Sequence, residues 1–204
     1  MRDVAELVEM NRFVGREFLL WLWFESELFE TNLKTSGGRV VSLWLETHLT
    51  LTMENEEARI KCPMPAAAPE AKQALQQGKL PKQARVHAIL DEHEFAWVMK
   101  AEELAIGALK IPAQLKAESD KYEALYERMR LTEELCAVLE ALYADFITLR
   151  LAPAWEETIA PELKVHAAQS RGGGPTLPLR ADHHHRARER DAERPHHIVL
   201  QHPG

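Results

Sequence analysis

The spacing of apolar residues changes after Ser119, and the change restricts the folds that this chain can adopt. In most of the segments between residues 39 and 110, apolar and polar residues alternate with the period of two that is typical of strands. After Ser119 the steps become three and four, which is typical of one side of a helix. The residues on that side are Tyr122, Leu125, Met129, Thr132, Cys136, Leu139, Tyr143 and Phe146. We therefore expect a sheet followed by one long amphipathic helix, capped by Ser119 and ending before Pro153.

Turn residues and prolines divide the alternating region into strands. Gly37 and Gly38 are typical of a turn and precede the alternating region. Pro63 and Pro65 interrupt it, because proline has no backbone N–H to donate to a sheet. The predicted strands are residues 39–46 and 48–54, which fit either two strands or one bent strand, then 58–62, 85–90, 94–99 and 104–110. A short helix is expected at residues 67–77. The sheet should be antiparallel, with about five or six strands.

An N-terminal helix is predicted before the sheet. Its longest apolar run is FLLWLWF, Phe18–Phe24, which is seven residues long. Because a membrane-spanning helix needs about 20 residues, we expect this run in the core. Its apolar residues fall on more than one side of the helix, which favours burial against the sheet and against a second chain. The charged N-terminus lacks the pattern of a signal peptide, so we expect a cytoplasmic protein with no membrane association.

We interpret residues 1–165 as a single α+β globular domain and residues 166–204 as a disordered tail rich in His, Arg, Gly and Pro. The net charge of −7 is distributed unevenly. The predicted domain has 19 Lys/Arg and 28 Asp/Glu, a net charge of −9, whereas the tail has 6 and 4, a net charge of +2. Because an acidic surface repels phosphate, nucleic-acid binding requires the basic residues of the domain to gather on one face.

The sequence lacks the common motifs of catalysis and nucleotide binding. Its glycine-rich stretches match neither GxxxxGK(S/T) nor GxGxxG, and it contains no GxSxG, CxxC or HExxH. Cys62 and Cys136 do not have the spacing of a zinc site, and we interpret the tail histidines as a solvated stretch. We expect no catalysis, no cofactor, no metal site and no small-molecule substrate. A hydrolase using Glu25, Glu27 or His93 is the least favoured alternative.

Residues 78–85, GKLPKQAR, form the most basic stretch of the predicted domain, with three positive charges and no acid. Lysines also keep edge strands soluble, and that role explains this stretch as well. The candidate phosphate contacts are Arg12, Arg16, Lys79, Lys82 and Arg85. The tryptophans that we interpret as core residues rather than base-stacking platforms are Trp21, Trp23, Trp44 and Trp97.

The segment Phe13–Glu27, FVGREFLLWLWFESE, resembles a block of the bacterial recombination-associated protein RdgC family. Ala144–Phe146, within the predicted long helix, is similar to the end of that family, whose N-terminal half has no counterpart here. The resemblance implies a non-enzymatic, ring-shaped homodimer that binds duplex DNA without strong sequence preference and restrains recombination. The residues that match the block are Gly15, Arg16, Glu17 and Trp21, and we carry no ligand role over to them.

Two function hypotheses follow. The first is a homodimeric, nucleoid-associated protein that binds duplex DNA without catalysis and acts in recombination or replication control. The second is a protein-interaction or structural module with no nucleic-acid role, which uses the aromatic N-terminal segment and the long helix as its contact surface. The acidic net charge favours the second. Basic side chains gathered on one face would favour the first, and an exposed apolar stripe on the long helix would favour the second.

Overall fold

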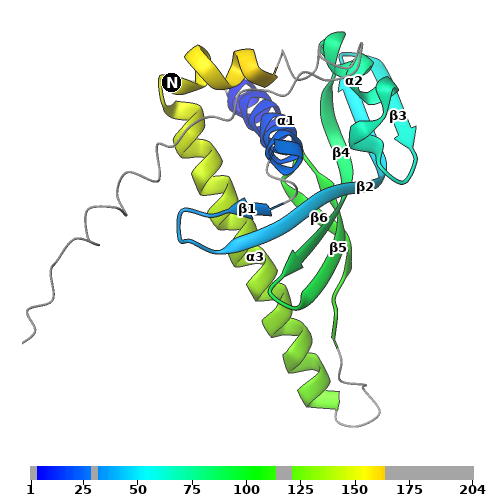
Figure 1. Cartoon of the computed structure of the whole chain (residues 1–204), viewed down its shortest axis with the longest axis vertical. Helices are drawn as coiled ribbons and strands as arrows, with labels where there is room; N and C mark the ends of the chain where they lie inside the picture. Colours follow the sequence, from blue (N-terminus) through cyan, green and yellow to red (C-terminus); the bar gives the residue numbers. More distant parts are fainter. Residues whose placement is uncertain (1–3, 29–31, 114–120, 164–204) are drawn as a thin grey trace, which may run out of the picture. The chain divides into compact units, whose positions relative to one another are not determined.

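The computed structural model of the chain describes residues 4–28, 32–113 and 121–163 (Figure 1). Its elements are α1 (Val4–Leu28), β1 (Asn32–Lys34), β2 (Val40–Met53), β3 (Glu56–Lys61), the 3-10 turn η1 (Pro65–Ala67), α2 (Pro69–Gln76), β4 (Leu80–Leu90), β5 (His93–Lys100), β6 (Ala105–Lys110), α3 (Lys121–Leu151) and the π-helical turn η2 (Trp155–Ile159). This order confirms the predicted α+β fold of an N-terminal helix, an antiparallel sheet and a long helix. The predicted tail at 166–204 and the predicted cap at Ser119 lie outside the described residues.

The described strands form one six-stranded antiparallel sheet. The strand order is β1-β2-β4-β5-β6, and β3 pairs with the second half of β2. The sequence left open whether residues 39–54 form two strands or one bent strand. The structure has one bent strand, β2. Its register against β4 shifts between Leu45 and Leu49, where Thr47 has a φ of 57°. An irregularity of this kind increases the local twist, and the second half of β2 pairs with β3 and β4 at once.

One face of the sheet is apolar and is covered by α1. Leu43, Ala88 and Phe95 lie side by side across β2, β4 and β5 and are fully buried. α1 contacts β2 and β4 on this face (Figure 1). The run Phe18–Phe24 is buried apart from Leu20, which is half-buried, so the prediction that it belongs to the core is confirmed. Full burial of one such side chain is worth about 1.5–3 kcal/mol, which makes α1 a major part of the core.

α3 contacts α1, and the side that it buries differs from the series of residues that predicted the helix. The buried residues are Ala124, Leu131, Leu135, Val138, Leu142 and Phe146. In the predicting series Phe146 is buried, Leu139 and Tyr143 pack half-buried against the core, and Tyr122, Leu125 and Met129 are exposed. α3 therefore has two apolar sides, one in the core and one that begins on the surface.

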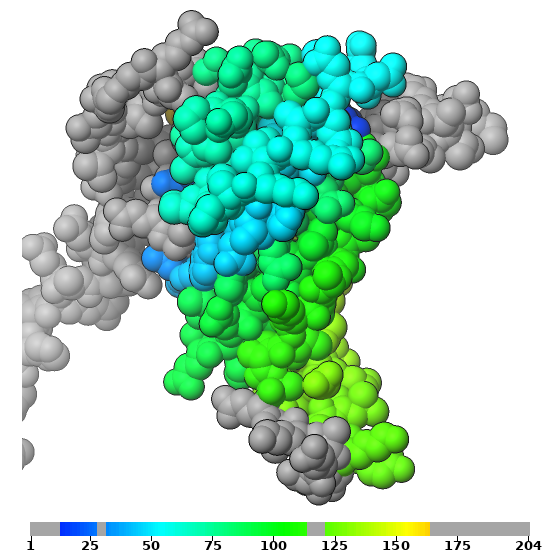
Figure 2. Space-filling model, turned by 90° about the vertical axis from the view of Figure 1, so that its right-hand side faces the viewer, coloured from blue at the N-terminus to red at the C-terminus, as the bar shows by residue number. Residues whose placement is uncertain are grey.

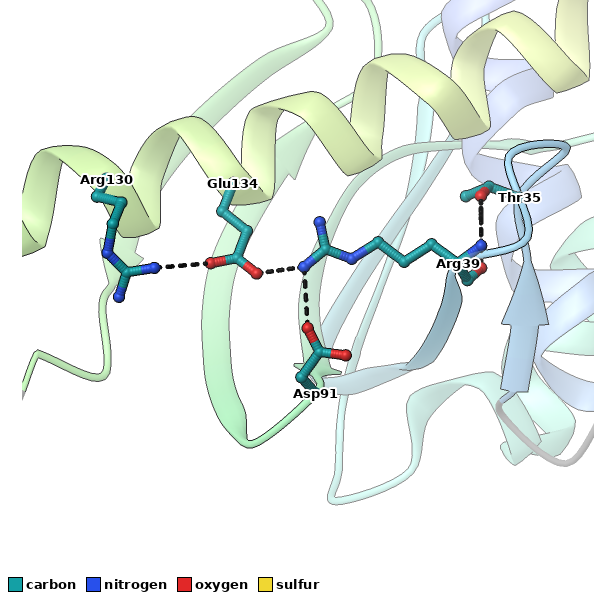
Figure 3. A network of polar contacts seen from close by, with 5 residues as sticks. All are labelled: Thr35, Arg39, Asp91, Arg130 and Glu134. Carbon is teal, nitrogen blue, oxygen red and sulfur yellow. Dashed lines mark hydrogen bonds and ion pairs between the residues drawn. The ribbon is translucent and has the colours of Figure 1, made fainter.

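A polar network connects α3 to the sheet (Figure 3). Arg39, immediately before β2, donates hydrogen bonds to the Glu134 carboxylate of α3 and, at 3.1 Å, to Asp91 Oδ2 between β4 and β5. Its backbone N–H donates to the Thr35 hydroxyl at 3.1 Å, and Arg130 lies 3.6 Å from Glu134. Burial lowers the pKa of Arg39, but the hydrogen bonds to Glu134 and Asp91 raise that pKa by more. The guanidinium therefore stays charged and bridges helix and sheet.

Candidate functional site

The face of the sheet opposite α1, here called the outer face, carries polar and charged side chains. Thr50 of β2 lies between Arg59 of β3 and Gln83 of β4, and Gln83 lies beside Lys100 of β5. Arg59, Gln83 and Lys100 are exposed, and Thr50 is half-buried. Figure 2 shows this side of the molecule, where the strands themselves form much of the surface in blue, cyan and green. The outer face is therefore the polar face of the sheet in this region.

A hollow of about 490 Å³ lies in the outer face, beside the second half of β2. Its lining residues come from β2, β3, β4 and β5 and are His48, Thr50, Glu57, Arg59, Lys61, Lys82, Gln83, Arg85 and Val98. Four of these residues are Lys or Arg, and one is Glu. We call this hollow the basic groove. A local excess of positive charge attracts anions even where the chain as a whole is acidic.

The cations of the basic groove differ in how they are paired. Arg59 donates to the Glu57 carboxylate, and this hydrogen bond raises the pKa of Arg59. Arg85 Nε lies 3.5 Å from a carboxylate oxygen of Glu46. Among the described residues, no carboxylate pairs with Lys61 or Lys82. The ammonium groups of Lys61 and Lys82 can therefore bind an incoming anion without first losing an ion-pair partner.

Trp44 also lies on the outer face, which corrects its interpretation as a core residue. Its ring stacks on His87 with the centroids 4.5 Å apart and an angle of 21° between the planes. Trp44 is half-buried, whereas Trp21, Trp23 and Trp97 are buried as predicted. The reason is the alternation of β2, which turns every second residue toward the outer face whatever its hydrophobicity. The outer face thus offers an aromatic pair as well as cations.

Two of the predicted phosphate contacts, Lys82 and Arg85, lie in the basic groove. Arg59 and Lys61, which the sequence did not single out, join them there. A signal for these two existed, because residues two apart in the strand predicted at 58–62 share one face. That they meet Lys82 depends on β3 and β4 pairing with opposite edges of β2, and no local pattern of the sequence determines this pairing.

The other three predicted contacts lie elsewhere. Lys79 is only 8% exposed, and its Nζ lies 2.8 Å from Glu56 Oε2. The hydrogen bond from Lys79 lowers the pKa of the Glu56 carboxyl. Arg16 of α1 pairs with Glu102, between β5 and β6. Arg12 also belongs to α1, but its side chain is outside the part of the chain that the structure describes. The candidate site is therefore built on β2, β3, β4 and β5.

The residues that match the RdgC block attach α1 to the rest of the fold. A side chain at position 15 would overlap the carbonyl oxygen of Ala101. Glycine therefore lets α1 lie closer to the end of β5 than any larger residue would allow. Glu17 accepts a hydrogen bond from Arg150 Nε of α3 at 2.9 Å, and Trp21 is buried. The contacts that these residues make within the fold explain their roles without a ligand.

Two residues of the hydrolase alternative, Glu27 and His93, contact neighbouring side chains of the fold. Glu27 accepts a hydrogen bond from Trp23 Nε1 at 2.8 Å and lies 3.7 Å from Lys72 Nζ. His93, the first residue of β5, lies beside the ring of Phe95 with the centroids 6.4 Å apart. Within residues 4–28, 32–113 and 121–163, no group of three or more His, Cys, Asp or Glu side chains is placed to hold a metal ion. In the same ranges, no helix has the length and apolar character needed to cross a bilayer.

Comparison with known proteins adds no relative to this picture. No family model, curated protein or solved structure matches the chain. A function must therefore be inferred from the geometry and charge of its own residues.

Proposed function

We propose that this chain is a non-catalytic, DNA-associated protein that holds the phosphate backbone of duplex DNA in the basic groove. One observation carries the proposal. Four cations from two strands of an acidic chain, β3 and β4, gather around a single hollow, on a sheet face whose strands form the surface. A groove of this kind concentrates positive potential where an elongated anion makes several contacts at once.

The types of side chain in the groove suggest how it would recognise DNA. Lys61 and Lys82 supply ammonium groups, which act as point charges on phosphate. Arg59 and Arg85 bind phosphate by exchanging Glu57 and Glu46 for it. Contacts to phosphate position a protein on the duplex but carry no sequence information. We therefore expect binding without sequence preference.

The biological setting of the proposal comes from the sequence. The resemblance of Phe13–Glu27 to the RdgC family suggests a role in the control of recombination or replication. That role requires access to chromosomal DNA, which agrees with the cytoplasmic, nucleoid-associated location expected from the sequence.

The salt dependence of duplex binding tests the proposal. We would measure fluorescence anisotropy of a labelled duplex with the full chain, from about 50 to 200 mM salt. If all four cations contact phosphate, the logarithm of the affinity should fall with the logarithm of the salt concentration with a slope of about −3 to −4. Lys82→Glu should weaken binding on every sequence and reduce the size of that slope by about one.

Lys34→Glu is the matched control. Lys34 is also an exposed lysine in a strand, and its substitution changes the net charge by the same amount. It pairs with Val40 at the end of β2 that is remote from the basic groove. If Lys34→Glu weakens binding as much as Lys82→Glu does, net charge rather than the groove holds the DNA. If the wild-type chain does not bind duplex DNA at low salt, the proposal is wrong.

The second candidate function is a protein-interaction module without a nucleic-acid role. It is favoured by the exposed apolar side chains of α3, Tyr122, Leu125, Tyr126 and Met129, and by the carboxylates Glu46 and Glu57 beside the groove cations. Absence of DNA binding, together with binding of a protein at α3, would select this function.

A further inference from the structure

The first turns of α3 expose large apolar side chains on one side. Tyr122 is 83% exposed, Tyr126 71%, Leu125 55% and Met129 53%. We call these four residues the α3 stripe. The opposite side of the same turns contains Ala124 and Leu131, which are buried in the core. Side chains that gather in this way on a helix whose core side is already occupied are typical of a contact surface.

The spacing of the α3 stripe is that of a helix pairing with another helix. Tyr122, Tyr126 and Met129 follow one another by four and three residues, so they occupy the two core positions of a heptad repeat. Leu125 lies at the edge of this seam. The next core position after Met129 is Glu133, an exposed carboxylate that ends the apolar part of the seam. The seam therefore extends over about two helical turns.

The charges beside the seam favour a second copy of this chain as the partner. Glu123 and Arg130 are seven residues apart, so they occupy the same heptad position on the same edge of the seam. Antiparallel helices bring equivalent edges together. When Tyr126 contacts Met129 of the second copy, Glu123 lies beside Arg130 of the second copy, and a two-fold axis repeats both contacts.

We propose that the α3 stripe pairs with the α3 stripe of a second copy in an antiparallel helix pair. In a parallel pair, the edge with Glu123 and Arg130 would face the opposite edge of the second copy, where Leu125 lies, so Glu123 and Arg130 would not meet. Arg130 has an exposed side chain, and its partner on the same helix, Glu134, lies 3.6 Å away and also accepts a hydrogen bond from Arg39. Because Glu134 keeps Arg39 as a partner, Arg130 turns toward a second copy at little cost.

The small size of the seam sets the expected strength of the dimer. An interface made by about two helical turns of each copy is at the low end of specific interfaces, so we expect a dissociation constant of about 1 to 100 µM. The full chain should therefore change from monomer to dimer across this range in sedimentation equilibrium. Tyr126→Ser, which removes a central aromatic contact from a surface position, should weaken the dimer by at least about tenfold.

A charge exchange tests the antiparallel geometry. Glu123→Arg and Arg130→Glu should each weaken the dimer by about fivefold, because each places like charges together twice. The double variant E123R/R130E restores both pairs and should return to within about threefold of the wild type. Arg128→Glu makes the same charge change as Arg130→Glu, but on α3 outside the seam, and it should leave the dimer unchanged.

Circular dichroism of each variant shows that the monomer is folded, so that loss of dimer and loss of fold are distinguished. A wild-type chain that stays monomeric at about 100 µM would overturn the proposal. It would also be overturned by a dimer that E123R/R130E does not restore, since a parallel pair or another surface would then hold the copies together.

Discussion

At the scale of single residues, Gly15 decides how closely α1 approaches the sheet. In a helix, alanine is favoured over glycine by up to about 1 kcal/mol. At Gly15, however, the added Cβ would overlap the backbone carbonyl of Ala101, which cannot rotate away as a side chain does. Overpacking of this kind costs about 1–3 kcal/mol. We predict that Gly15→Ala lowers the free energy of unfolding by about 1–2 kcal/mol, measured by urea denaturation.

Gly37→Ala is the control for this prediction. Gly37 is exposed, and a Cβ there would meet only the Thr35 hydroxyl at an ordinary 3.8 Å. Its substitution should change the free energy of unfolding by less than about 0.5 kcal/mol. A Gly15→Ala variant that is more stable than the wild type would show that α1 moves away from Ala101 without loss, and that the close approach does not matter to the fold.

The need for glycine at position 15 could not be inferred from its neighbours. The sequence around it predicts a helix and a buried apolar run, and both are confirmed. The group that excludes a side chain is the backbone carbonyl of Ala101, which lies far along the chain, directly after β5. Short-range periodicity reports which side of a helix is apolar, but not how close the opposing backbone lies.

At the scale of elements, Arg39 connects α3 to the start of β2 and to the turn between β4 and β5. Its guanidinium bonds both Glu134 and Asp91, and the side chain of Glu134 is only 17% exposed. Arg39→Met leaves Glu134 paired with Arg130 in this network and removes the bridge to the sheet (Figure 3). Because Arg39 is itself 35% exposed and therefore screened by solvent, we predict a modest loss of about 1 kcal/mol in the free energy of unfolding.

Asp91→Asn provides the comparison, since the Asp91 side chain is 69% exposed. Its effect should be smaller than that of Arg39→Met, because an exposed ion pair contributes about 0–1 kcal/mol. Hydrogen exchange should locate the larger effect in the amides of α3 around Glu134. Equal losses in the two variants, or faster exchange confined to the strands, would contradict the bridging role of Arg39.

The elements themselves were largely predictable, but their faces were not. Period-two alternation located the strands because a sheet with one buried face imposes that period. α3 was located by a series whose first half, including Tyr122 and Met129, is exposed, while its core side rests on Ala124 and Leu131. A helix with two apolar sides has no single amphipathic face, so the sequence predicts that it is a helix without indicating which side enters the core.

At the scale of the whole molecule, average charge conceals the basic groove. Residues 1–165 have a net charge of −9, yet pairing of β3 and β4 with β2 brings Arg59 and Lys61 to Lys82 and Arg85. The sequence predicted two of these four cations, since Lys82 and Arg85 fall in its most basic stretch. The other two required the strand order, because long-range pairing depends on the whole sheet rather than on local composition.

The two proposals together predict how DNA length affects binding. A dimer presents two basic grooves, and a duplex that reaches both is held more tightly through the increased effective concentration at the second groove. We predict that the wild-type chain binds a duplex of about 40 base pairs roughly tenfold more tightly than one of about 10 base pairs, when both affinities are expressed per binding site. Tyr126→Ser should abolish this difference without changing the affinity for the short duplex.

Lys82→Glu separates the roles of groove and dimer in this experiment. It should weaken binding to both duplexes, because each groove loses a phosphate contact whether or not the copies are paired. If Tyr126→Ser is monomeric in sedimentation and still prefers the long duplex, two copies bind side by side through the DNA alone. In that case α3 pairing has no part in holding DNA, and the grooves act independently along the duplex.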